Sequence, residues 1–153
     1  MSAENRIKEL GIELPTPPDP VGNFIGATRT GNLIYLSGHG PRNADGSMIA
    51  GKVGVDMDID EAYAAARNVG LGLLATLKAH IGDLNKVKRV IKTLGMVNAV
   101  PEFNNHPKVI NGASDLFADV FGDAGRGARS AVGMGSLPFQ IPVEVEMIIE
   151  IED

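Results

Sequence analysis

The alternation of apolar and polar residues predicts two long helices. Residues 58–80 open with a capping box, Asp58 followed by Glu61, and then carry apolar residues at spacings of three and four that form one buried stripe. A second helix is expected from Pro107, where proline suits the first turn, to Gly122, which suits a C-cap. The many Ala and Gly residues of the first helix predict that it packs closely on a sheet.

Segments with the two-residue period of a strand flank these helices. They are residues 24–29, 33–36, 87–97, 129–137 and 143–151, with a shorter strand expected beside the Asp45-Gly46 turn in residues 43–54. Gly31 separates the first two segments and predicts a hairpin turn. The resulting order, β-β-β-α-β-α-β-β, predicts an α+β fold in which a mixed sheet carries two helices on one face.

The last segment indicates what lies on the other face of that sheet. In residues 143–151, apolar residues alternate with Glu144, Glu146, Ile148 and Glu150. The apolar set is typical of a core face, whereas the second set is too acidic for a core and, at Ile148, too apolar for a simple surface. A half-polar sheet face without a helical cover predicts that subunits associate around shared pockets.

The first twenty residues differ from the rest of the chain. Residues 1–14 could form a short helix with Ile7, Leu10 and Leu14 on one side, and residues 15–20, rich in proline, then interrupt regular structure. We therefore expect an N-terminal helical arm and connection at residues 1–20. Residues 21–153 would form one domain, as the length of the chain suggests.

Composition narrows the classes of function. Apolar residues make up 44% of the chain and charged residues 22%, which is typical of a globular protein. Cysteine is absent, so disulfides, thiolate metal sites and a thiol nucleophile are excluded. The net charge of −5 speaks against nucleic acid as a partner, and no segment resembles a signal peptide or a membrane helix. The histidines are scattered, so we expect no metal site. We also expect a cytoplasmic protein that uses no cofactor.

One arginine stands out as a candidate for chemistry. On a strand, Arg129, Ala131, Gly133 and Gly135 share one face, which leaves an open space beside a guanidinium. Such a fork suits a carboxylate ligand, although from spacing alone the arginine could equally pair with a neighbouring glutamate. His39 could line the same cleft and transfer a proton, or it could be a surface residue at a strand end.

Three segments resemble the Rid/YjgF family, also described as endoribonuclease L-PSP. They are GARSAVGMGSLP followed by PVEVEMIIEI, the strand of residues 31–38, and the helix end at residues 113–122. The matches occur in the right order and cover about residues 22–151. The resemblance implies a chorismate-mutase-like fold and a homotrimer with three clefts between subunits.

The resemblance also implies roles for individual residues. Members hydrolyse imines or enamines of amino acids to 2-oxo acids and ammonia; the arginine that holds the substrate carboxylate matches Arg129, and the glutamate that positions water matches Glu144. Ser37 and Gly38 match the edge of the pocket.

Two departures from the family pattern indicate a divergent branch. Phe24 stands where a tyrosine is usual, and Ala131 where a cysteine is common. Both are expected at the substrate-binding pocket, so they leave a second hypothesis open: a non-catalytic trimer that binds small carboxylates. A third hypothesis, that the protein is a ribonuclease or a translation inhibitor, is disfavoured because the net negative charge of the chain repels the phosphate backbone of RNA.

Overall fold

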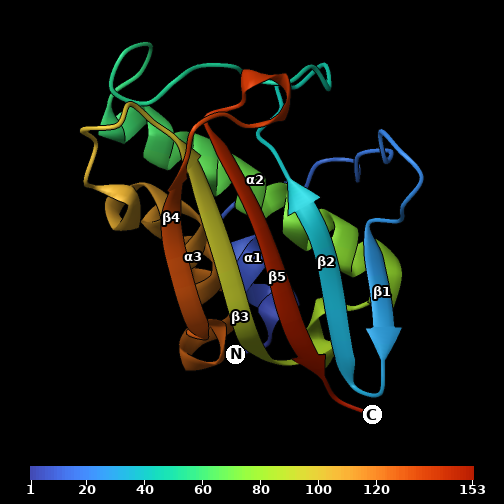
Figure 1. Ribbon diagram of the computed structural model, residues 1–153. Coiled ribbons are helices and arrows are strands. Elements are labelled where there is room, and N and C mark those ends of the chain that lie inside the picture. The colour runs from blue at the N-terminus through green and yellow to red at the C-terminus, as the bar shows by residue number, and fades with distance from the viewer.

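A computed structural model describes residues 1–153, and a sheet of five strands forms its centre (Figure 1). The strands are β1 (Ala27–Thr30), β2 (Leu33–His39), β3 (Val87–Asn98), β4 (Ala128–Met134) and β5 (Val143–Ile151), in the spatial order β1-β2-β5-β3-β4. All neighbours are antiparallel except β3 and β4, which are parallel because a helix connects them.

Helices cover one face of this sheet and leave the other open (Figure 1). The two long helices are α2 (Ile59–Ile81) and α3 (His106–Phe121), and a short helix, α1 (Ala3–Glu9), packs beside α3. Three single 3₁₀ turns, η1 (Leu84–Lys86), η2 (Gly122–Gly125) and η3 (Pro138–Gln140), complete the regular structure. The predicted α+β fold with a mixed sheet is therefore confirmed.

The ends of the long helices follow from capping groups in the sequence. Asp58 accepts a hydrogen bond from the backbone N–H of Glu61 at 2.8 Å, and the Glu61 side chain completes the predicted capping box. Gly82 (φ 87°) and Gly122 (φ 64°) end α2 and α3 in a backbone conformation that favours glycine.

Small residues let α2 and α3 approach each other closely. A Cβ atom on Gly112 of α3 would overlap the backbone carbonyl oxygen of Tyr63, and one on Gly70 of α2 would lie 2.9 Å from Leu116 Cδ2. The small residues of α2 therefore serve its contact with α3 as well as its contact with the sheet.

The two faces of β5 have the predicted characters. Its apolar set is buried beneath the helices: Val143, Val145, Met147, Ile149 and Ile151. The other set lies on the open face, where it is joined by apolar side chains of neighbouring strands. Among these, Tyr35 of β2 is 42% exposed and pairs with Ile148, and Val132 of β4 is 39% exposed and pairs with Met96. The open face is thus partly apolar across four strands.

Residues 43–54 do not form the expected strand. The turn at Asp45-Gly46 is present, because the Gly46 N–H donates to the Asn43 carbonyl at 2.9 Å, but only isolated bridges follow it. Gly51 (φ 149°) and Gly54 (φ 97°) interrupt the extended backbone that a strand needs. The first strand also begins later than predicted, at Ala27 rather than at residue 24.

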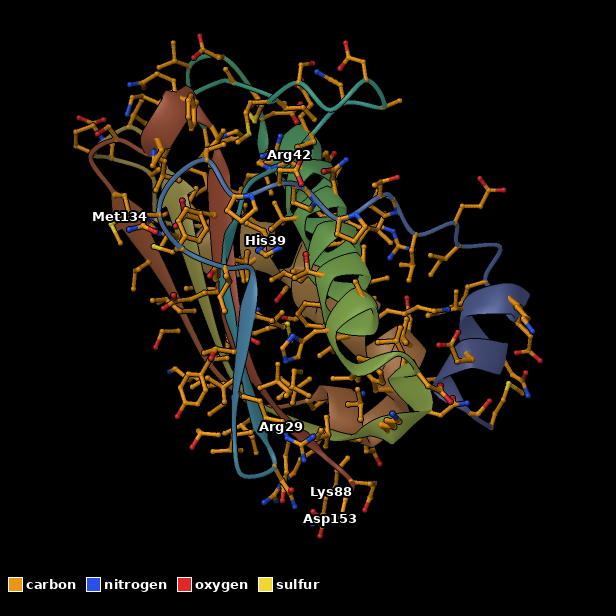
Figure 2. The ribbon with its side chains drawn as sticks, turned by 90° about the vertical axis from the view of Figure 1, so that its right-hand side faces the viewer. Arg29, His39, Arg42, Lys88, Met134 and Asp153 are labelled. Atoms are coloured by element: carbon orange, nitrogen blue, oxygen red, sulfur yellow. The ribbon has the colours of Figure 1, made fainter.

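The N-terminal arm is held against the helices. Ile7 is buried in the common core, and the Glu4 carboxylate accepts hydrogen bonds from Lys78 Nζ at 2.8 Å and from the Leu84 N–H at 3.0 Å. The proline-rich connection that follows passes over the end of the molecule where His39 and Arg42 lie (Figure 2). No helix combines the length and the apolar character that crossing a membrane requires.

Candidate functional site

An irregularity in β2 shapes the candidate site. Leu36 pairs with Met147 and His39 with Val145, so β2 has one more residue than β5 between these pairs. The extra residue turns His39 towards the helices and leaves Ser37 and Gly38 together at the rim of the sheet. Ser37 is fixed there because its hydroxyl donates to the Ile25 carbonyl at 2.6 Å.

The carboxylate of Glu144 occupies the space beside Gly38. A Cβ atom at Gly38 would lie only 2.5 Å from Glu144 Oε2, so the absent side chain makes room for the carboxylate. Burial, and secondly the charge of Glu146, raises the pKa of Glu144 above its ordinary value. Glu144 can therefore hold a proton at a higher pH than a solvated glutamate, which suits a group that exchanges protons with a ligand.

A cavity of about 430 Å³ opens at this point, within the range of small-molecule sites. Five residues predicted for the site border it: Phe24, Ser37, Gly38, His39 and Glu144. The proline-rich connection contributes residues 18–21, and the loop before β5 contributes residues 138, 139 and 141. The fold thus gathers residues that are far apart in the sequence.

His39 borders this cavity but has no free ring nitrogen. Its side chain is buried, lying between the sheet and α2 (Figure 2), with Nδ1 2.6 Å from the Ser37 carbonyl and Nε2 2.8 Å from Thr76 Oγ1. Because a carbonyl only accepts, Nδ1 carries the proton and Nε2 accepts from Thr76. Burial lowers the pKa of His39, so the ring is neutral at pH 7. It is neither the surface histidine nor the proton-transfer group that the sequence suggested.

Arg129 lies on the opposite face of the sheet from Glu144. It pairs with Thr93, which in turn pairs with Met147 of the core, so its side chain points towards α3. There Nη1 donates to Asn111 Oδ1 at 2.7 Å and to Ser114 Oγ at 3.2 Å. Arg129 forms no ion pair with a carboxylate, so the alternative in which it ties two strands through a glutamate is wrong.

The positions of β4 and the following residue that share a face with Arg129, namely Ala131, Gly133 and Gly135, leave only a partly open space. Ala131 shares its face and packs against the core, while a Cβ on Gly133 would lie 2.6 Å from His106 Nε2. At Gly135, by contrast, nothing lies within 4 Å of such a Cβ. The open space predicted beside the guanidinium is therefore narrowed by His106.

Three residues of these two regions were not predicted from the sequence. Asn111 and Ser114 hold the guanidinium of Arg129, and their spacing of three on a helix is a signal that could have identified them. Arg42 borders the cavity beside Glu144, and no sequence pattern marks it.

Comparisons with known proteins agree with this fold. The family model described as "YjgF/chorismate mutase-like, putative endoribonuclease" matches residues 4–151. Protein TCP17 from Trypanosoma cruzi is 39% identical over 96% of this chain and 92% of its own length. The crystal structure of protein Atu1372 from Agrobacterium tumefaciens, whose function is unknown, superposes with a TM-score of 0.89 at 46% identity, covering 99% of this chain and 94% of that one.

One relative has a name that states an activity. It is the 2-iminobutanoate/2-iminopropanoate deaminase of Dermatophagoides farinae, 31% identical over 92% of this chain and 95% of its own length. A family match over nearly the whole chain, supported by these relatives, settles the classification. This chain belongs to the YjgF/chorismate mutase-like family.

Proposed function

We propose that this protein hydrolyses reactive 2-imino and 2-enamino acids to 2-oxo acids and ammonia, in clefts between the subunits of a homotrimer. The observation that carries the proposal is the half-buried Glu144 carboxylate, with its raised pKa, beside Gly38 in a cavity of ligand size. The name of the Dermatophagoides farinae relative supports the same reaction.

The chemistry needs positioning and proton transfer more than a strong nucleophile, because the imine carbon is already electrophilic. A guanidinium on the substrate carboxylate would place C2 beside Glu144. Water adds to C2 while Glu144 accepts one of its protons and returns it to nitrogen. The remaining hydroxyl proton then passes through the same carboxylate to nitrogen, so that the C=O bond forms as the C–N bond breaks and ammonia leaves. A carboxyl whose pKa is raised serves both proton transfers better than an ordinary one.

The positions of Arg129 and Glu144 support an assembly of several copies. The two side chains lie on opposite faces of one sheet, with β3 between their strands, so they cannot meet on one ligand within a single chain. They can meet if the β4 edge of one copy packs against the open face of another. The partly apolar character of that face, which includes Tyr35, Met96 and Val132, favours such packing.

The decisive experiment measures the release of 2-oxo acid from 2-iminobutanoate that an amino-acid oxidase generates in the same solution. The wild type should exceed the spontaneous rate, and Arg129→Ala and Glu144→Gln should each return to it. Arg29→Ala is the matched control, since Arg29 lies on β1 and its one side-chain hydrogen bond is to the Gly31 carbonyl at 2.8 Å. No acceleration by the wild type would refute the proposal.

Mixing the two inactive variants tests the location of the site. If Arg129 and Glu144 come from different subunits, refolded mixtures of equal amounts contain clefts in which both residues are intact. About a quarter of the wild-type activity should then return. Mixtures that remain inactive would contradict a cleft to which two subunits contribute Arg129 and Glu144.

A non-catalytic carboxylate-binding trimer is the second candidate, favoured by Phe24 and Ala131, which replace residues usual in the family. It would be stabilised thermally by 2-oxo acids without any turnover. The family description also mentions an endoribonuclease, but the cavity carries Asp19, Glu144 and Glu146, whose carboxylates oppose a phosphate backbone.

A further inference from the structure

A second arginine, Arg42, borders the cavity that contains Glu144 and also the neighbouring cavity beside Gly46. Arg42 follows β2 and lies beside the first half of α2, near His39 (Figure 2). The side chain of Asn68 on α2 holds its backbone twice: Asn68 Oδ1 accepts from the Arg42 N–H at 2.8 Å, and Asn68 Nδ2 donates to the Arg42 carbonyl at 2.9 Å. The position of Arg42 is therefore fixed by the fold and does not depend on a ligand.

The charge of Arg42 is not used within the chain. Its guanidinium forms no ion pair with a carboxylate, and its only side-chain hydrogen bond runs from Nη1 to the Gly46 carbonyl at 2.9 Å. A guanidinium has five N–H donors, so most of them are free. A half-buried arginine with free donors on the wall of a cavity is suited to a carboxylate, which it can bind with paired hydrogen bonds.

We propose that Arg42 binds a second carboxylate of the substrate, so that the site acts on 2-imino acids that are dicarboxylic. This inference rests on the proposed function, in which Arg129 of a neighbouring copy holds the carboxylate next to the imine. Glu144 then faces the reacting carbon between the two guanidinium groups. Arg42 would thus select the substrate by its distal end and take no part in the proton transfers.

The cavity has room for such a ligand. A five-carbon 2-imino dicarboxylate has ten non-hydrogen atoms, which fill roughly 300 Å³ if each takes no more than the ~30 Å³ of a water molecule. The cavity measures about 430 Å³. Asp19 and Glu146 also border it, but both are exposed, so water and salt screen their charges more than that of half-buried Arg42.

The test compares two ligands that differ only at the distal end. 2-Oxoglutarate and 2-oxopentanoate share a five-carbon chain, and only the first has a second carboxylate. By calorimetry, the wild type should bind 2-oxoglutarate about tenfold or more tightly than 2-oxopentanoate. Arg42→Gln should remove this preference and leave 2-oxopentanoate binding unchanged, whereas Arg42→Lys should keep part of it. Arg29→Gln is the control, because Arg29 also donates to a backbone carbonyl but lies outside the cavity.

Turnover of the corresponding imines, generated from glutamate and norvaline, provides a second readout with the same expected order. A wild type without preference for the dicarboxylate, or an Arg42→Gln variant that weakens both ligands equally, would overturn the role of Arg42. If the wild type hydrolyses the norvaline-derived imine without that preference, only this inference fails. If it neither binds nor hydrolyses any of these compounds, the proposed function fails as well.

Discussion

Replacing Gly38 by alanine tests whether the space beside this residue holds Glu144 in its working position. The new Cβ would lie 2.5 Å from Oε2, 3.0 Å from Cδ and 3.3 Å from Cγ of Glu144, whereas ordinary contacts begin near 3.4 Å. The carboxylate must therefore move by about 1 Å. A displacement of that size at a reacting group can lower the rate by about a hundredfold, and we expect kcat/KM for 2-iminobutanoate to fall by that factor.

The same substitution should change stability little. Gly38 does not adopt a positive φ, so its backbone accepts alanine, and the group that must move is the end of a flexible, half-buried side chain. We expect the free energy of unfolding, from urea titration, to change by less than about 1 kcal/mol. A matched control is Gly72→Ala on α2, where the nearest atom, His39 Cδ2, lies at 3.8 Å. That variant should keep its activity and gain about 0.5–1 kcal/mol from helix propensity.

A double-mutant cycle distinguishes two causes of a lower rate in Gly38→Ala, a displaced Glu144 carboxylate and a cavity blocked by the new methyl group. Glu144→Asp shortens the side chain by one methylene and withdraws it from the new methyl group. In that background, Gly38→Ala should cost only about threefold in kcat/KM, because the two changes relieve each other. Full activity of Gly38→Ala in the wild-type background, or a hundredfold loss in both backgrounds, would refute the reasoning.

Three further variants test the electrostatics, the assembly and the packing. Glu144→Gln should raise the melting temperature at pH 7 relative to the wild type. The raised pKa of Glu144 means that its ionisation destabilises the fold as the pH rises above about 4.5, so the difference in melting temperature should vanish below that pH. A variant that melts at a lower temperature than the wild type at pH 7 would contradict this reasoning. Val132→Glu places a charge on the open face and should shift the protein towards monomers in light scattering, whereas Val55→Glu, on an exposed turn, should not. If both variants have the same oligomeric state, the open face is not the interface. Gly112→Ala should lower the free energy of unfolding by about 2–3 kcal/mol in urea titration, since its Cβ meets backbone, and a loss under about 0.5 kcal/mol would show that the helices can separate freely.

The elements that could be predicted from sequence are those in which local signals agree with tertiary contacts. The helix starting at Asp58 has a capping box, an apolar stripe and Gly82 at its end, and it forms within a residue of the prediction. Residues 43–54 have turn residues as well, but no signal in the sequence shows that Gly51 and Gly54 adopt positive φ values and prevent a strand. Backbone dihedrals of glycine depend on surroundings that a pattern does not contain.

The candidate site shows the same limit. The residues at the cavity were found because family resemblance marked them, and alternation correctly placed Arg129 with Ala131. Alternation could not show that Glu144 lies on the other face, because the faces of separate strands are related only through their pairing register. His39 was misjudged for a related reason: the additional residue in β2 reverses its direction, and a single bulge cannot be read from composition or period.

That bulge allows one strand to serve two environments within a few residues. In a regular strand, Leu36 and Gly38 would face the helices, and His39 would point outwards with Ser37. Deleting Gly38 would remove the bulge without turning the imidazole: Ser37 would pair with Glu146, His39 would still pair with Val145 and face Thr76, and only Glu144 would lose its glycine neighbour. The additional residue therefore shapes the cavity side of the sheet alone, and the helix-facing side keeps the same pairing whether or not that residue is present.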